Sequence, residues 1–333
     1  MTLKDVAYLA GVSTSTVSRV VSGKDMVAPK LRNKVEKAIK KTGYTPNVNA
    51  RALANQNAGS IGLITPDLSL AFFGTLAAGV IEAADERGIL VDICNSNGAI
   101  GHHLAFIKTL QNRGFRNIIL DDVHCDEEQI INLCKDIPGL VLINRFIPQI
   151  ANRCVCIDNI LGGAIAASHL LENGHENIVF LTSSSPISDP LERIRGAKQV
   201  MSQYGILVHK CVTVSGNPTI NGGREAVRIL LEKGDKFTGV LAYNDNMATG
   251  ALNELQDRGY KVPEDISVVG FDNLAISIAC RPALTTMDYP IREMAAYAVK
   301  LSLELTSKEG VKPNITHRFI PTLIERKSVI KMN

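Results

Sequence analysis

The amino-terminal stretch decides the fold of the first part of the chain. Residues 3–23 read LKDVAYLAGVSTSTVSRVVSG. Val6, Leu9 and Ala10 recur at i, i+3 and i+4, the spacing that gives a helix one apolar face. Gly11 comes next, and glycine adopts the positive φ of a tight turn without steric cost. The pattern therefore predicts a short helix that ends at a glycine turn.

A second helix is expected directly after this turn. Ser13 is a typical N-cap, and Val17, Val20 and Val21 again share one helical face. Two short helices joined by a turn that contains glycine form the helix-turn-helix pattern, whose second helix enters the major groove of DNA. The outer face carries small hydroxyls and one long cation, suited to phosphates and base edges: Thr14, Ser15, Ser18 and Arg19. A polar face that meets only solvent is the alternative.

Charge is distributed unevenly along the chain. The 333 residues have a formal net charge of +3, but residues 1–57 hold ten Lys or Arg against three Asp or Glu, a local net of +7. The rest of the chain therefore carries −4. Leu31, Val35 and Ala38 repeat at helical spacing among lysines and arginines, which predicts a third, basic helix ending at Gly43. A basic domain on a mildly acidic body favours a nucleic acid as its partner.

Membrane, disulfide and metal proteins are not supported. No apolar run approaches the ~18 residues of a membrane span, and no basic-then-apolar signal segment opens the chain, so we expect a cytoplasmic protein without membrane contact. The seven cysteines are odd in number and include no CxxC pair. Packed, reduced thiols are therefore expected, with no metal site.

From Ser60 onward, apolar strands alternate with amphipathic helices. Such strands indicate parallel sheets covered on both faces, and about nine of them fit two doubly wound lobes better than one sheet. The expected strands are 61–65, 89–94, 117–121, 139–144, 155–158, 177–182, 210–215, 239–243 and 266–271. The expected helices are 73–87, 102–113, 126–135, 161–173, 191–204, 220–233, 246–258 and 290–307.

Polar residues gather just past the predicted strand ends. Ligands of open α/β sheets bind outside the carboxyl ends of the strands, so a cleft between two lobes would be lined by these residues. The sequence has no glycine-rich dinucleotide or triphosphate motif and no Gly-x-Ser-x-Gly elbow. This edge therefore favours binding of a neutral hydroxylated molecule, without a cofactor, over catalysis.

Two groups of motifs make the whole chain resemble the LacI/GalR family of bacterial transcription repressors. The first group is KDVA at 4–7, GVS at 11–13, TVSRV at 16–20, GYxPN at 43–47 and ARAL at 50–53. The second is GH at 174–175, YND at 243–245, PEDISVVGFD at 263–272 and LTT at 284–286. The match covers residues 2–330, and PGLVLINR at 138–145 and NDNMA at 244–248 are similar to the galactose-repressor branch.

The resemblance implies a particular domain organisation. A small all-α helix-turn-helix headpiece is expected at residues 1–46, and a hinge helix with a linker at 47–58. The core at 59–333 is expected to be an α/β, two-lobed, periplasmic-binding-protein-like body with two doubly wound parallel sheets, used for effector binding and dimerisation. The amino-terminal lobe would comprise about 59–157 plus 288–318, and the carboxyl-terminal lobe about 158–287 plus 319–330.

The resemblance also implies how the DNA end works. Bases would be read by Thr14, Ser15 and Arg19, and phosphates bound by Ser13, Thr16, Ser18, Ser22 and Tyr44. Residues 48–54 correspond to the hinge helix, which pairs with its dimer mate in the minor groove, where Leu53 would wedge into the central base step. Asn47 and Arg51 of the same segment are further DNA-binding candidates. A homodimer would bind a double-stranded, pseudo-palindromic operator, and an effector that separates the hinges would lower operator affinity.

An effector site between the two lobes follows from the same resemblance. Amides, carboxylates and a guanidinium match sugar hydroxyls, and aromatic rings cover the C–H face of a sugar. The candidates are Asp67, Phe72, Phe73, Asn95, Asp121, Asn144, Arg193, Asn217, Asn244, Asp272 and Tyr289. Helix capping is the alternative for an acidic residue here, and core packing for the two phenylalanines. Galactose is the best single expectation, with another hexose, a pentose or a glycoside as alternatives.

Three departures from the galactose repressors bear on these expectations. Asn97 stands where they have Tyr, and Asp121 where they have His. Thr14 and Ser15 replace their Val-Ala pair, so the operator sequence stays open. A purine-sensing repressor of the same family and a free-standing sugar-binding protein are the competing interpretations, although the latter would have no use for residues 1–57. An enzyme is not expected, because no catalytic constellation is present.

Overall fold

The chain divides into two compact units, each described here by itself. The computed structural model describes residues 2–21, 27–44, 60–99, 101–121, 125–307 and 317–332. The units are Met1–Gly59 and Ser60–Asn333.

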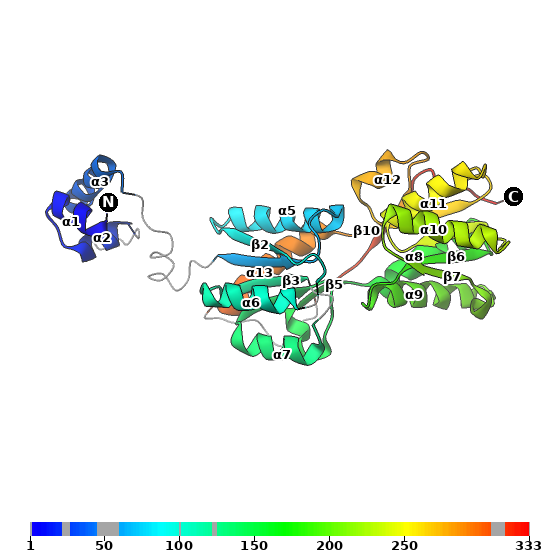
Figure 1. Ribbon diagram of the computed structural model, residues 1–333, viewed down its shortest axis with the longest axis horizontal. Helices are drawn as coiled ribbons and strands as arrows, with labels where there is room; N and C mark the ends of the chain where they lie inside the picture. Colours follow the sequence, from blue (N-terminus) through cyan, green and yellow to red (C-terminus); the bar gives the residue numbers. More distant parts are fainter. Residues whose placement is uncertain are drawn as a thin grey trace. The chain divides into compact units, whose positions relative to one another are not determined.

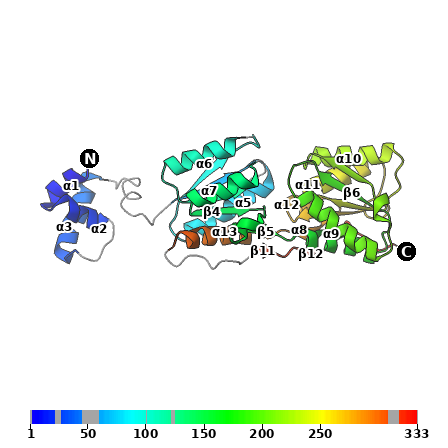
Figure 2. The same ribbon diagram turned by 90° about the horizontal axis from the view of Figure 1, so that it is seen from below.

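The described part of the first unit consists of α1 (Leu3–Ala10), α2 (Thr14–Val21) and α3 (Pro29–Thr42), coloured blue in Figures 1 and 2. Val6, Val17 and Val35 come from one helix each, are fully buried and belong to one core. The expected helix-turn-helix and basic third helix are therefore confirmed.

The turns of this unit follow from particular residues. Gly11 after α1 and Gly43 after α3 both have φ +62°, the left-handed conformation in which glycine carries no steric penalty. Ser13 directly precedes α2, and its Oγ accepts a hydrogen bond of 3.2 Å from the Thr16 backbone N–H.

One expectation for α1 was wrong. Leu9 is 45% exposed, and Ala7 is buried in its place. The inward stripe of α1 runs along Val6, Ala7 and Ala10, so Leu9 lies outside it.

The second unit contains two sheets, each with six strands among the described residues. The first has the order β11-β5-β4-β3-β1-β2, formed by β1 (Ile61–Thr65), β2 (Val91–Asn95), β3 (Asn117–Asp121), β4 (Gly139–Ile143), β5 (Cys154–Ile157) and β11 (His317–Phe319). The second has the order β12-β10-β9-β8-β6-β7, formed by β6 (Ile178–Ser183), β7 (Thr213–Gly216), β8 (Gly239–Ala242), β9 (Ser267–Asp272), β10 (Thr285–Asp288) and β12 (Thr322–Ile324).

Helices cover both faces of each sheet (Figure 1). On the first sheet, α5 (Ala71–Asp85) and α13 (Ile291–Thr306) share one core, while α6 (His102–Asn112) and α7 (Glu127–Asp136) pack on the other face. On the second sheet the two pairs are α8 (Asn159–Glu172) with α9 (Asp189–Gln203), and α10 (Ile220–Glu232) with α11 (Asp245–Asp257). This is the doubly wound, two-lobed body that the sequence predicts.

The remaining elements were not predicted. They are the short helix α12 (Ala275–Ala279), the 3-10 helices η1 (Pro148–Arg153) and η2 (Val208–Lys210), and the strands β10, β11 and β12. β10 reads TTMD, and its polar side chains conceal a buried strand: the Thr286 hydroxyl donates a 2.6 Å hydrogen bond to Asp245 Oδ1. Both sheets are parallel as expected, except that β12 runs antiparallel to β10.

All seven cysteines lie in the described part of the chain, and all are free thiols. Four of them are buried, and burial raises the pKa of the Cys154 thiol to about 12. The expectation of packed thiols therefore holds for these four, while Cys94, Cys211 and Cys280 are half-buried. Among the described helices, none is long and apolar enough to cross a membrane.

Candidate functional site

The outer face of α2 presents polar side chains to solvent. Thr14, Ser15, Ser18 and Arg19 are all exposed there. The Ser13 hydroxyl is hydrogen-bonded to the Ser15 hydroxyl at 2.7 Å and to the Thr16 hydroxyl at 2.9 Å. Because Val17 on the inner side is fully buried, the polar face is held on a packed core.

Other DNA-binding candidates lie elsewhere. Tyr44 is half-buried and packs against the core of the first unit. Ser22, Asn47, Arg51 and Leu53, together with the expected hinge segment 47–58, lie outside the described residues.

In the second unit, several effector candidates meet at the carboxyl edge of the first sheet. Asp121 ends β3, and Asn144 directly follows β4 with φ +63°. Asn144 Nδ2 donates a 2.8 Å hydrogen bond to Asp121 Oδ2. Tyr289, which follows β10 of the second sheet, donates its hydroxyl proton to Asn144 Oδ1, also at 2.8 Å. These three residues therefore form one chain of hydrogen bonds between the sheets.

Aromatic rings adjoin this chain of hydrogen bonds. The ring centres of Phe72 and Tyr289 are 5.0 Å apart with nearly perpendicular planes, and those of Phe72 and Phe73 are 5.3 Å apart. On its other side Tyr289 meets Phe271 of β9, at 6.3 Å between ring centres. Edge-to-face geometry of this kind is favourable for aromatic pairs. Tyr289 is thus packed between groups from both sheets.

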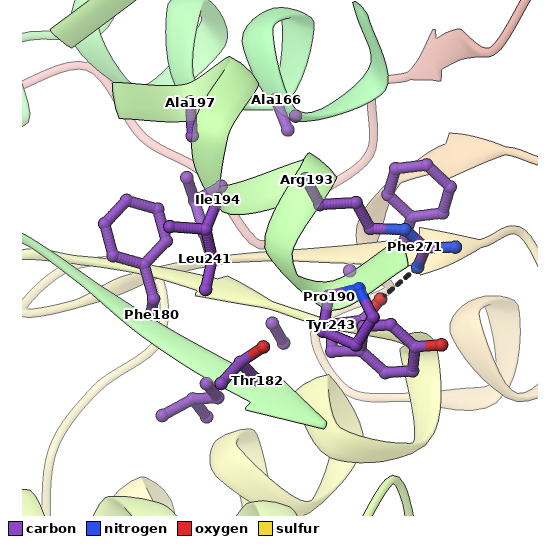
Figure 3. Close-up of a pocket in the computed structure, with 14 residues that line it drawn as sticks. Ala166, Phe180, Thr182, Pro190, Arg193, Ile194, Ala197, Leu241, Tyr243 and Phe271 are labelled. Carbon is purple, nitrogen blue, oxygen red and sulfur yellow. Dashed lines mark hydrogen bonds between the residues drawn. The ribbon is translucent and has the colours of Figure 1, made fainter. Parts of the chain in front are cut away.

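Arg193 on α9 is the central group at the edge of the second sheet. Its Nε donates to Asn159 Oδ1 at 2.9 Å. Its Nη1 donates to the Tyr243 carbonyl oxygen, as Figure 3 shows. The guanidinium carbon lies 3.6 Å from the ring centre of Phe271 and 3.9 Å separates its Nη1 from Asp272 Oδ1. Arg193 is therefore buried with its charge opposed, its Nε and Nη1 atoms bonded and its guanidinium against an aromatic ring.

Close helix packing places Arg193. A Cβ atom on Gly163 of α8 would lie 1.9 Å from the Arg193 carbonyl oxygen, and one on Gly196 of α9 would lie 1.8 Å from the Ile160 carbonyl oxygen. Only glycine lets the two backbones approach this closely. The pair α8 and α9 therefore brings Asn159 and Arg193 together.

Buried carboxyls surround this arginine. Burial raises the pKa of Asp189 to about 6, against the opposing effect of the Arg193 guanidinium. Burial also raises the pKa of Asp272 well above its usual value, again opposed by Arg193. Sequence reasoning missed Asp189, because Ser188-Asp189-Pro190 reads as an ordinary helix start.

Several other candidates serve the local structure. Asn244 Oδ1 accepts from the Met247 backbone N–H at 2.8 Å, capping α11, and its Nδ2 donates to the Pro218 carbonyl oxygen. Asp67 Oδ1 accepts from the backbone N–H and hydroxyl of Ser69. Asn244 therefore caps a helix, and Asp67 stabilises a turn. Asn217 is exposed beside the start of α10.

Two hollows differ greatly in size. The cavity in Figure 3, between α8, α9 and the second sheet, has about 30 Å³, which suits a single water molecule. An open hollow of about 310 Å³ is lined by Asp272, Tyr289, Thr75 and Arg292, among others. Small-molecule sites begin at roughly this second volume. The hollow beside Asp272 and Tyr289 therefore has room for a small ligand, and the cavity in Figure 3 does not.

The sequence matches known families and proteins. Residues 2–47 match the bacterial regulatory proteins of the lacI family, and residues 167–329 match a periplasmic binding protein-like domain. The transcriptional regulator GalS of Salmonella typhimurium is 39% identical over 99% of this chain and 96% of its own. The transcriptional regulator GalR of Escherichia coli is 38% identical over 98% and 95%.

The chain belongs to the LacI family. The crystal structure of the lac repressor dimer bound to operator and the anti-inducer ONPF superimposes with a TM-score of 0.89 at 26% identity, covering 99% of both chains. The family match and this likeness confirm the expected fold and identify a DNA-binding transcriptional regulator, not an enzyme.

Proposed function

We propose that this LacI-family regulator represses sugar-utilisation genes by binding operator DNA through the outer face of α2. The exposed hydroxyls and guanidinium of that face carry the proposal, because they project from a rigid core in the part of the chain with a net charge of +7. Base contacts come from Thr14, Ser15 and Arg19 and phosphate contacts from the neighbouring hydroxyls.

The chain acts as a homodimer on two half-sites. The headpiece at 1–46 reads a half-site, the hinge segment at 47–58 follows it, and the core at 59–333 binds effector and partner. Leu53, Asn47 and Arg51 contact the minor groove in this proposal. The operator-bound dimer of the lac repressor supports it by likeness.

The effector is a small sugar at the polar edge where the two sheets of the second unit meet. The hydrogen-bonded groups of Asp121, Asn144 and Tyr289 supply acceptors and donors, and Phe72 supplies an apolar face. Arg193 and Asp272 supply the charged groups from the other sheet. Similarity to the galactose repressors makes galactose the first sugar to test.

The test measures binding to a palindromic operator of the galactose type at fixed salt, with and without D-galactose. Salt is fixed because phosphate contacts make affinity steeply salt-dependent. Tight binding relieved by galactose supports the whole proposal. Tight binding that responds to a purine and to no sugar overturns the effector, and failure to bind any DNA fragment overturns the repressor.

A further inference from the structure

Three side chains form a row across neighbouring strands of the first sheet. Strands β3, β1 and β2 are adjacent, Thr65 is paired in register with Asn95, and Asp121 lies one step beyond the Ile64–Leu120 pair. Residues at matched positions in parallel strands project to the same face, roughly 4.8 Å apart. We name Asn95, Thr65 and Asp121 the edge row.

The edge row faces the same side of the sheet as the aromatic groups of the site. Leu63 and Ile119 precede Thr65 and Asp121 by two residues on their strands, and both belong to the core that α5 and α13 cover. Tyr289 belongs to that core, and Phe72 packs against it. The edge row therefore ends the strands on the side of the proposed effector site.

Thr65, the middle residue of the edge row, has a hydroxyl without a hydrogen-bond partner among the described residues. Thr65 is fully buried, and its Oγ1 has no hydrogen-bond partner among the described residues. Its neighbours have other partners: Asn95 Oδ1 accepts from the Leu68 backbone N–H at 3.2 Å, and Asp121 Oδ2 accepts from Asn144 Nδ2 at 2.8 Å. A buried polar group without a partner is costly and rare, so this one points to a ligand atom.

The charge around the row is negative. The carboxyls of Asp121, Asp189 and Asp272 all act electrostatically on the buried hydroxyls of Tyr243 and Tyr289, and the Arg193 guanidinium opposes them. Arg193 lies beside the second sheet, where it donates hydrogen bonds to Asn159 and to the Tyr243 carbonyl oxygen. Three carboxyl groups and one guanidinium therefore act on these two hydroxyls. The site therefore disfavours an anionic sugar and favours a cation.

We propose that the edge row binds the ammonium group of an amino sugar. The ammonium has three donors and no acceptor, which suits the Thr65 lone pairs beside the Asp121 carboxylate. This assignment rests on the proposed function, since it names the class of sugar taken by the same site.

The test is calorimetric titration of the full-length chain at neutral pH with D-galactosamine, D-glucosamine, their uncharged parent sugars and the N-acetylated derivatives. We expect one amino sugar to bind about tenfold tighter than its parent, which corresponds to about 1.4 kcal/mol, and the N-acetylated form to lose this gain. Galactose 6-phosphate should bind more weakly than galactose.

Two near-isosteric variants test the row itself. Asp121→Asn should bring the affinities for amino and parent sugar to within about threefold of each other, whereas Asp136→Asn on exposed α7 should leave the tenfold difference intact. Thr65→Val should weaken binding of the amino sugar and raise the thermal midpoint of the ligand-free protein, because it removes a buried unpartnered hydroxyl. A lowered midpoint with unchanged amino-sugar affinity overturns the role of Thr65.

The outcomes separate this inference from the proposed function. Equal affinities of the wild-type chain for amino and parent sugars overturn the inference and leave a sugar-responsive repressor. Operator binding with no affinity for any of these sugars overturns the sugar effector as well.

Discussion

The Tyr289 hydroxyl donates a 2.8 Å hydrogen bond to Asn144 Oδ1, although Tyr289 follows a strand of the second sheet and Asn144 follows a strand of the first. Tyr289 also contacts Phe72 on α5 and Phe271 on β9. A single side chain thus joins groups from both sheets. Any change in the relation of the two sheets must alter its contacts.

Tyr289→Phe should remove the hydrogen bond that links Tyr289 to Asn144. The substitution keeps the ring contacts but leaves Asn144 Oδ1 without its donor, so the free energy of unfolding should fall by about 1 kcal/mol. The sugar concentration that half-releases operator should also change. Urea unfolding and operator titrations measure both effects. Tyr260→Phe, at an exposed tyrosine, is the matched control. Unchanged stability and unchanged sugar response in Tyr289→Phe would show that the bond does not matter.

Stability should fall as pH rises from about 4 to 7. Asp189 has its pKa raised from 3.8 to about 6, so the folded chain keeps this proton to a higher pH than the unfolded chain. Its contribution is complete below the unfolded pKa and disappears as pH rises through the folded pKa.

Asp189→Asn tests that pH dependence. It should remove on the order of 2 kcal/mol of the decline in the free energy of unfolding. Asp245, whose pKa burial raises to about 7, should retain a separate part of the decline. Urea unfolding at pH 4.5 and 7.5 provides the comparison, with Asp136→Asn as control. An unaltered decline in Asp189→Asn contradicts the assignment.

Arg19 and Lys34 should affect DNA binding in different ways. Arg19→Ala, on the outer face of α2, should cost about 1–3 kcal/mol with the operator and little with unrelated DNA. Lys34→Ala, on exposed α3, should weaken both complexes alike and reduce the salt slope by about one. Competition binding at several salt concentrations distinguishes them. Equal losses on both DNAs for Arg19→Ala would assign it to phosphate.

An exposed apolar surface on the first sheet should mediate dimerisation. Leu90, just before edge strand β2, is 67% exposed, and Ile81 on α5 and Ile93 on β2 are also exposed. An edge strand with exposed apolar side chains readily associates. Leu90→Asp should shift the chain toward monomer in sedimentation velocity, while Leu207→Asp, at another exposed leucine, should not. A Leu90→Asp chain that remains dimeric moves the interface elsewhere.

Much of the fold was predictable because its signals are local. The three helices of the first unit follow from valine spacing, Ser13 and two glycines, and the apolar strands of the core follow from continuous runs such as Ile61–Thr65. β10 was missed because its threonines are buried by partners distant in sequence, Asp245 and Ser328. The β-propensity of a residue type carries no information about partners that are distant in the sequence.

The candidate site was only partly predictable. Resemblance located Arg193, Asp272 and Tyr289, which the structure brings into one cluster around Phe271. It did not reveal that the side-chain oxygen of Asn244 caps α11, or that Asp189 is buried beside Arg193. The burial of Asp189 depends on how α9 packs against α8, which no single stretch of sequence encodes. The Asn244 cap is instead a local contact at the start of α11.

The last strands of the chain complete both sheets. β11 pairs with β5, and β12 pairs with β10, so each sheet takes an edge strand from residues 317–324. During synthesis neither sheet can close until these residues have left the ribosome. The second unit should therefore reach its native state only after residues 317–324 have emerged, and a stop before β11 would damage both sheets together.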